Sequence, residues 1–451
     1  MPDQFIVGVD IGSSKLCSAV AVREQGGSIR YVGHGSAPSA GMRGGDIVDT
    51  DALSGSLKRA AEEARYLIGT EVQDIALCVS GARLEVLERA GGVDLDPGRR
   101  IGPAEVMRAV SDLRGGEHGG VQSIHRVVRS FAIDTEPVAD PTGRSGRRLD
   151  VWVRDFAIPT SLVERLRRAA DAAGVRIHTF LPEGVAVGAA TLSQSERDAG
   201  VAVIDIGSAT TDIAVYLNGD LHHLTAFPLG GHHITQDVAS ILNVSIEDAE
   251  RLKRTHGVVS RDDAEDDLIL DWTPRTIAML QRQATYGNVP PSAIRSITAA
   301  RVIQIVDRAK EILDGFEVTR RLRSGVVLTG GTAQLDGIVD IARTILGVPV
   351  RTGTILAGDG FPAIADPGAA AAVGLTRYCA TRASVATPQS SPRSAAATAI
   401  VHPVVARSLA KPDTIDVIPR RGPRRGERSG WGQAVRDWFR EFIPVKPDSG
   451  A

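Results

Sequence analysis

The sequence predicts an α/β body made of two related halves, followed by a polar tether and a terminal amphipathic helix. Three observations lead to this prediction. A strand, a turn of small residues and a second strand occur at 5–22 and again at 201–216. A Gly-Gly turn follows an apolar strand within 325–339. Aromatic residues gather on one face of 431–443, although they are scarce elsewhere in the chain.

Length and composition limit the protein class. The 451 residues allow two or more compact lobes of about 100–200 residues each, and a net charge of −2 argues against a general polyanion binder. Cys17, Cys78 and Cys379 are too scattered for a disulfide framework or a metal site, so a reducing cytosol is expected. Neither a signal sequence nor a run of eighteen apolar residues is found, so any membrane contact is expected to be peripheral.

The first repeated element is a β-hairpin with a turn suited to phosphate. Small residues let backbone N–H groups approach phosphate oxygens, and hydroxyl side chains add donors. The residues concerned are Asp10, Gly12, Ser13, Ser14 and Lys15 in the first copy, and Asp205, Gly207, Ser208, Ala209, Thr210, Thr211 and Asp212 in the second. Asp10 and Asp205 are candidates to hold Mg²⁺, through water. One such hairpin could be a plain turn, but two copies about 195 residues apart indicate a phosphate chain held between halves.

A third segment, 325–339, reads GVVLTGGTAQLDGIV. The apolar strand is expected to end at Leu328 and to lead through a tight turn into a helix. Bare backbone at Gly330, Gly331 and Thr332 suits the flat face of an adenosine. On its own, the segment could equally be an ordinary helix entry.

The last element is a helix over 431–443, WGQAVRDWFREFI, with an apolar and a polar half. It is about 20 Å long, too short to cross a bilayer of about 30 Å but suited to the interface. The apolar side chains expected to enter the membrane are Trp431, Val435, Trp438, Phe439, Phe442 and Ile443. The alternative is a helix that docks on the protein's own core.

The tether at 381–430 is rich in Ala, Ser, Thr, Pro and Arg, and is expected to be a disordered linker. It ends in a basic run, Arg420, Arg421, Arg424, Arg425 and Arg428, which favours an anionic lipid surface. The alternative is that this segment only increases the solubility of the protein. Arginine runs also bind nucleic acid, but no aromatic platform accompanies this one, so no nucleic-acid partner is expected.

The order of these motifs resembles the actin, heat-shock chaperone and sugar kinase superfamily, and within it the chain is similar to the FtsA family of bacterial cell-division proteins. Further segments carry the likeness across most of 5–378: GHGSAPSAGMRGGDIVD, HRVVRSFAIDTEP, AERLKRTHGVV and AAAAVGLTRY. The resemblance implies duplicated actin-like ATPase lobes with a ribonuclease H-like fold and a small α/β subdomain inserted in the first lobe.

The resemblance also implies an organisation into parts. The first lobe would comprise 1–82 and 161–200, with the inserted subdomain at 83–160. The base of the second lobe would comprise 201–234 and 318–380, and its upper subdomain 235–317. The linker at 381–430, the membrane helix at 431–443 and a tail at 444–451 complete the chain.

Site residues follow from the resemblance by position. Gly230, Gly231, Glu250 and Lys253 match nucleotide contacts, although the last two could simply pair with each other on an exposed helix. Glu183 matches a water-positioning carboxylate, or is only a favourable charge at a helix start. Arg301 matches a basic partner contact, or is an ordinary solvated helix residue.

The implied function is an ATP- and Mg²⁺-binding switch with at most slow hydrolysis. Such a protein would polymerise on the cytoplasmic face of the inner membrane at the division site and anchor polymers of the tubulin-like FtsZ through their C-terminal tails. Self-association, anionic phospholipid and other division proteins contacting 83–160 are the implied partners. A pilus-type actin-like adaptor or a soluble sugar-kinase-like enzyme is the alternative.

Overall fold

The computed structural model describes residues 4–113, 120–259, 274–285, 287–382 and 401–402. The chain forms two compact units. Within the described ranges, the first contains residues up to His232 together with 316–334 and 348–402, and the second contains 233–315 and 335–347. The predicted membrane helix at 431–443 and most of the predicted linker lie outside the described residues.

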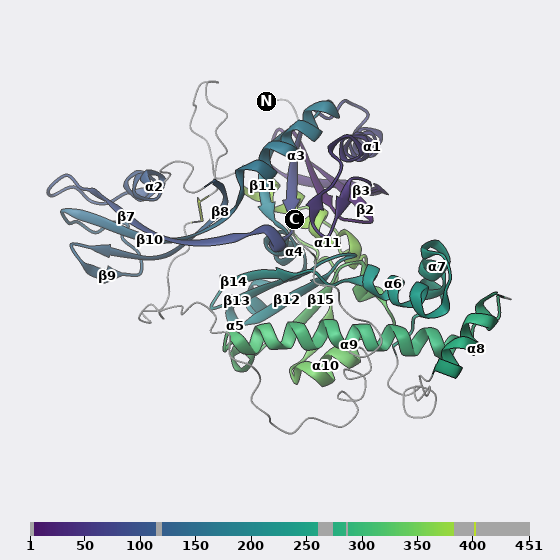
Figure 1. Ribbon diagram of the computed structural model, residues 1–451. Coiled ribbons are helices and arrows are strands. Elements are labelled where there is room, and N and C mark those ends of the chain that lie inside the picture. Colours follow the sequence, from purple (N-terminus) through teal and green to yellow (C-terminus); the bar gives the residue numbers. More distant parts are fainter. Residues whose placement is uncertain (1–3, 114–119, 260–273, 286, 383–400, 403–451) are drawn as a thin grey trace. The chain divides into compact units, whose positions relative to one another are not determined.

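The first unit contains two five-stranded sheets of the same topology (Figure 1). One has the order β11 (Arg176–Pro182), β6 (Asp74–Val79), β1 (Gln4–Ile11), β2 (Lys15–Arg23), β3 (Ile29–Pro38). The other has the order β16 (Val350–Thr352), β15 (Val326–Thr329), β12 (Val201–Ile206), β13 (Thr211–Leu217), β14 (Asp220–Phe227). Parallel and antiparallel pairings also correspond strand by strand. The predicted duplicated α/β body is therefore confirmed.

Two small-residue helices form the core of this unit. α11 (Ala370–Arg382) contacts β1, β2 and α4 (Glu183–Thr191), and α4 contacts β12 and β13 of the other sheet. A Cβ on Gly374 would lie 1.9 Å from the Ala186 carbonyl oxygen, so the two helices meet with no room for a side chain there. This close packing fixes the two sheets, and hence the two hairpins, relative to each other.

The opposite face of the first sheet is covered by α1 (Thr50–Ile68) and α3 (Thr160–Ala172). Asp49 caps α1 by accepting from the N–H groups of Asp51 and Ala52, both at 3.0 Å. The remaining short elements of the unit are β4 (Met42–Arg43), β5 (Asp46–Ile47), α5 (Gln194–Ala199), η1 (Gly81–Arg83), η2 (Thr319–Arg321), η3 (Gly331–Gln334) and η4 (Pro367–Ala369).

Between η1 and α3 the chain forms a separate sheet with one helix, inside the range 83–160 predicted as an insertion. Its elements are β7 (Glu85–Asp94), α2 (Pro103–Asp112), β8 (Val121–Ile133), β9 (Glu136–Val138) and β10 (Arg148–Pro159). Arg126 fastens α2 to this sheet, because its guanidinium pairs with buried Asp155 at 2.5 and 2.7 Å and donates to the Val110 carbonyl at 2.8 Å.

A short strand, β17 (Val401–His402), pairs in parallel with β8. The sequence analysis predicted a linker without regular structure at this position. The strand contains only Val401 and His402, which is too short to be recognised within the surrounding polar composition.

The second unit is helical. It contains most of α6 (Gly231–Leu242), together with α7 (Ile246–His256), α8 (Pro274–Thr285), α9 (Pro291–Gly315) and α10 (Ile338–Leu346). Val238, Leu242, Leu280, Ile294 and Ile297 form its buried core. α10 packs on α9, so it belongs with this unit, whereas the sequence analysis assigned 318–380 as a whole to the base of the second lobe.

Candidate functional site

The two hairpin turns have the same backbone hydrogen bond. Gly12 N–H donates to the Lys15 carbonyl at 3.0 Å, and Gly207 N–H donates to the Thr210 carbonyl at 3.0 Å. A Cβ on Gly12 would lie 2.7 Å from the Lys15 carbonyl oxygen, which explains why glycine is needed in this turn. Both turns therefore present short, unhindered backbone between paired strands.

The strand pairing of the two hairpins shows which of their residues occupy equivalent positions. Asp10 lies opposite Cys17 in the first hairpin, and Asp205 lies opposite Asp212 in the second. Lys15 in the first turn corresponds to Thr210 in the second. The two hairpins therefore have the same backbone arrangement but different side chains. The first supplies the Lys15 ammonium, and the second supplies the Asp212 carboxylate in addition to Asp205.

Four carboxyl groups of this unit interact with one another. Burial raises the pKa of Asp205, with further contributions from the charges of Asp212 and Asp10. Burial likewise raises the pKa of Asp10 to about 6, although the Lys15 ammonium opposes that change. The pKa of Glu183 lies well above its usual value because of burial and the other three carboxylates. This concentration of negative charge favours binding of a cation.

The Asp212 carboxylate is fixed by hydrogen bonds from residues that directly follow β6 of the first sheet. It accepts hydrogen bonds from the Gly81 N–H and, at 2.8 Å, from the Ser80 hydroxyl, both at the start of η1. Burial raises the pKa of Asp212 to about 6 despite these bonds. Ser80 and Gly81 were not predicted from the sequence, because only the fold brings the end of β6 beside the second hairpin.

The predicted adenosine turn lies against the second hairpin. Gly330 has φ +90°, and a Cβ there would lie 2.3 Å from Asp205 Oδ1. Thr332 Oγ1 donates to the Gly207 carbonyl at 2.9 Å. The strand extends to Thr329, one residue beyond the expected end, and the turn continues as η3 rather than directly as an α-helix.

The start of α6 completes this arrangement. A Cβ on Gly230 would lie 2.6 Å from the Gly207 carbonyl oxygen, and one on Gly231 would lie 2.3 Å from Thr332 Oγ1. The Gly231 N–H also donates to the Gly207 carbonyl at 2.9 Å. The structure therefore brings together Gly207, Gly230, Gly231, Gly330 and Thr332, all predicted site residues.

The donor set fits a hydrated Mg²⁺ better than a directly ligated ion. Among the described residues no three His, Cys, Asp or Glu side chains are close enough together to bind a metal ion directly. The charge of Asp10 nevertheless raises the pKa of Asp205, so the two carboxylates lie near one region of charge. Mg²⁺ keeps several of its waters, and these could bridge to both carboxylates.

The other two predicted nucleotide residues lie in the helical unit and contact each other. Lys253 Nζ lies 2.6 Å from Glu250 Oε2 and donates to Thr235 Oγ1 at 2.9 Å. Burial alone would raise the pKa of Glu250, but hydrogen bonds from Lys253, Thr235 and Arg254 lower it to about 2. Glu250 and Lys253 therefore form a paired polar group on α7, next to the start of α6.

Arg301 is buried on α9. Its guanidinium forms two hydrogen bonds with Asp237 on α6, at 2.6 and 2.7 Å. Only 4% of the residue is exposed. The predicted role of Arg301 as a basic contact for a partner would require this internal pair to break, a cost that the sequence pattern gave no reason to expect.

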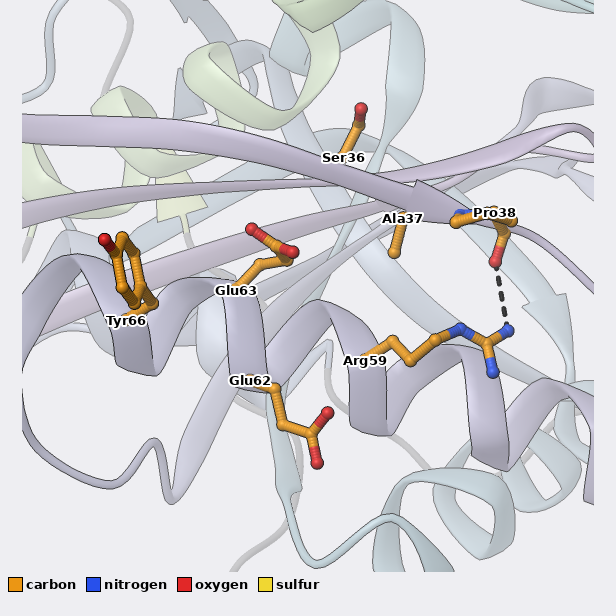
Figure 2. Close-up of a pocket in the computed structure, with 7 residues that line it drawn as sticks. All are labelled: Ser36, Ala37, Pro38, Arg59, Glu62, Glu63 and Tyr66. Atoms are coloured by element: carbon orange, nitrogen blue, oxygen red, sulfur yellow. Dashed lines mark hydrogen bonds between the residues drawn. The ribbon is translucent and has the colours of Figure 1, made fainter.

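A shallow pocket of about 570 Å³ lies over β3 and α1 (Figure 2). Its lining residues are Ser36, Ala37, Pro38, Arg59, Glu62, Glu63 and Tyr66. None of them is a predicted site residue, although Pro38 pairs with Lys15 of the first hairpin. In the part of the chain that the structure describes, no helix combines the length and apolar character needed to cross a membrane.

Comparison with known proteins agrees with this geometry. The family described as Cell division protein FtsA matches residues 202–374. Cell division protein FtsA of Neisseria meningitidis serogroup B is 31% identical over 353 residues, 78% of this chain and 84% of the relative. Cell division protein FtsA of Bacillus subtilis is 30% identical over 387 residues, 85% of each chain.

A solved structure described as the PilM-PilN type IV pilus biogenesis complex shares the fold, with a TM-score of 0.52 at 19% identity, covering 82% of this chain and 97% of that one. The fold is thus the actin-like one that the resemblance implied. Because its similarity to the meningococcal and Bacillus proteins extends over most of their length, the chain belongs to the FtsA family of cell division proteins.

Proposed function

We propose that the chain binds ATP with Mg²⁺ between its two hairpins and uses it as a conformational switch. The repeated turn carries this proposal, because two backbone turns with the same hydrogen bond lie on sheets held together by α4 and α11. The other backbone N–H groups of the turns that begin at Gly12 and Gly207 would contact phosphate oxygens, together with the hydroxyls of Ser13 and Ser208. Gly330 and Gly331 would receive the adenosine.

Asp10 and Asp205 would hold the Mg²⁺ through its waters. The bound ion would neutralise phosphate charge and offset the repulsion among the buried carboxylates. Against the effect of burial, the charge of Lys15 lowers the pKa of both aspartates, and it would also attract phosphate. Each of these groups favours a polyphosphate with its cation over a neutral ligand.

Hydrolysis is proposed to be slow. Glu183 begins α4, near Asp10, Asp205 and Asp212, and its raised pKa favours the neutral form. A protonated carboxyl positions water as a hydrogen-bond donor but is a poor base. A site of this kind suits a switch that changes state over many seconds more than a rapidly cycling enzyme.

We further propose that the protein attaches to the cytoplasmic face of the inner membrane at the division site. The support is the sequence of 431–443 and the basic run before it. Full burial of a large apolar side chain contributes about 1.5–3 kcal/mol, and interfacial burial contributes less, so one helix should bind reversibly. A filament would present many helices at high effective concentration and bind much more firmly.

In this proposal the ATP-bound filament anchors FtsZ polymers through their C-terminal tails. The helical unit around α9 would receive the tail, and the inserted sheet of β7, β8 and β10 would contact neighbouring protomers and other division proteins. Membership of the cell-division family supports this assignment. The family membership also favours it over the pilus adaptor and sugar kinase alternatives.

Liposome sedimentation tests the membrane part. Replacing Trp438 and Phe439 with Glu should release the full-length protein from vesicles containing anionic phospholipid, with ATP affinity unchanged. Replacing Gln433 with Glu and Arg440 with Gln lowers the net charge equally on the polar half of the helix, and should weaken sedimentation only slightly. Equal sedimentation of the Trp438 and Phe439 variant and the unaltered protein would contradict the proposal.

A further inference from the structure

The segment Asp366–Gly368 connects three parts of the first unit. The Pro367 carbonyl accepts from Thr329 Oγ1 at 3.0 Å and from the Gly330 N–H at 3.2 Å, which fastens the segment to the proposed adenosine turn. The same segment begins η4 and leads into α11. No residue of this segment was singled out from the sequence.

Asp366 is the polar centre of the segment. Its carboxylate caps η4 by accepting from the Gly368 N–H at 2.9 Å. His34 Nε2 lies 3.5 Å from its other oxygen, Oδ2. The His34 hydrogen bond lowers the pKa of Asp366, and the charge of Lys15 lowers it further, so the carboxylate is ionised at neutral pH.

His34 is itself held in place on β3. The Tyr31 hydroxyl lies 2.6 Å from His34 Nδ1. These side chains are three residues apart and share one side of the strand because β3 has an irregularity in its pairing with β2, where Val32 is skipped. Tyr31 packs against Phe361 with ring centroids 5.3 Å apart, so the ring positions are fixed by the core. When the Tyr31 hydroxyl donates to Nδ1, the hydrogen of the imidazole is on Nε2, which faces Asp366.

Lys15 reaches the same segment from the first hairpin. The point where a Cβ on Gly368 would lie is 2.9 Å from Lys15 Nζ and 3.2 Å from Asp366 Oδ1. A side chain at this position would overlap the ammonium, so glycine leaves Lys15 room beside the segment; Gln334 Nε2 lies 3.1 Å from the same point and donates to Asp366 Oδ1 at 3.5 Å. Lys15 also acts electrostatically on Asp10 and Asp205, so three carboxylates compete for one ammonium.

We propose that Asp366, oriented by His34, is a positioning residue that holds the Lys15 ammonium ready for the phosphates of the bound nucleotide. Asp10 and Asp205 draw the ammonium toward the base of the hairpins, where the Mg²⁺ is expected. Asp366 draws it toward Gly368 and leaves the region of the two aspartates to the cation. The inference rests on the proposed nucleotide function and adds a residue outside the predicted phosphate motifs.

The competing explanation is that Asp366 only caps η4. Asp366→Asn distinguishes the two roles, because an amide oxygen still accepts from the Gly368 N–H but carries no charge. A cap would be largely preserved in this variant. A charge that positions Lys15 would be lost.

The experiment is a double-mutant cycle with full-length protein, measured as the calorimetric affinity for ATP in the presence of Mg²⁺. The four proteins are the unaltered chain, Asp366→Asn, Lys15→Ala and the double variant. Asp366→Asn is expected to weaken ATP binding about tenfold in the Lys15 background, within the range for coupled neighbours. In the Lys15→Ala background it should have no further effect, because the charge that it positions is gone.

His34→Ala should weaken ATP binding in the same direction but to a smaller extent, and should add nothing to Asp366→Asn. Asp49→Asn is the matched control, since it changes a capping carboxylate of α1 in the same way and should leave ATP affinity unchanged. An equal loss from Asp366→Asn in both Lys15 backgrounds, or no loss in either, would overturn the inference. If the unaltered chain takes up no ATP, the proposed function fails and this inference falls with it.

Discussion

Two neighbouring glycines of the adenosine turn should respond differently to the same substitution. Gly330 has φ +90°, and a Cβ there would lie 2.3 Å from Asp205 Oδ1 and 2.5 Å from the Ile206 carbonyl oxygen. At Gly331 a Cβ would meet no atom within 4 Å. Ala at either position adds one methyl group. Gly330→Ala therefore tests the effect of backbone strain and overlap, whereas Gly331→Ala tests the effect of filling the space proposed for the ligand.

The magnitudes follow from these distances. A non-glycine residue in a sparsely populated backbone region costs about 1–3 kcal/mol. Overlap with fixed neighbours typically adds about 1–3 kcal/mol, so Gly330→Ala should cost about 2–6 kcal/mol in stability. Folded domains are stable by only about 5–15 kcal/mol, so this is a large fraction. Gly331→Ala should change stability by less than about 0.5 kcal/mol.

Thermal unfolding and ATP calorimetry on the two variants measure both effects. Gly330→Ala is expected to melt several degrees lower than the unaltered protein. Gly331→Ala is expected to melt normally but to bind ATP more weakly, because its methyl group would occupy the space proposed for the adenosine. Equal melting temperatures for all three proteins would refute the structural reasoning, and unchanged ATP affinity in Gly331→Ala would refute the proposed position of the adenosine.

Two further predictions concern buried charge. Arg126→Ala should destabilise the inserted sheet by about 3–5 kcal/mol, because it leaves Asp155 buried without its main partner; hydrogen exchange should show faster exchange in α2 and β8, and unchanged exchange would contradict this. Burial raises the pKa of Asp10 and of Asp212 to about 6 in the folded protein. The raised values contribute stability below about pH 4, where both carboxyls are protonated, and this contribution is lost as the pH rises through 6. Mg²⁺ should therefore raise the melting temperature more at pH 7.5 than at pH 5, and the difference should shrink in Asp10→Asn; equal shifts at both pH values would refute it.

The hairpins could be predicted from the sequence because their pattern is local. The pairing within each hairpin is specified by about twenty consecutive residues: an apolar strand, a Gly-containing turn and a second apolar strand. Because this pattern occurs twice, the sequence also predicts that the body is duplicated. The pairing of Asp10 with Cys17 and of Asp205 with Asp212 follows from these short segments.

Contacts between distant segments could not be predicted in this way. His34 and Asp366 are brought together by the pairing of β3 and by the path of the chain before α11, and neither has a sequence signature. The same holds for Ser80 with Asp212. Arg301 lies on a helix with many apolar residues, and its burial depends on Asp237 of another helix, which periodicity within α9 cannot reveal.

The account depends most on nucleotide binding by the paired hairpins. Calorimetric titration of the full-length chain with ATP and Mg²⁺ tests this directly, with the Gly12→Val and Gly207→Val variants as comparison. One ATP should bind per chain, and each variant should lose most of that affinity because a branched side chain would meet the facing carbonyl oxygen of the turn. Well-folded protein that takes up no adenine nucleotide, or variants that bind it as tightly as the unaltered chain, would contradict the account.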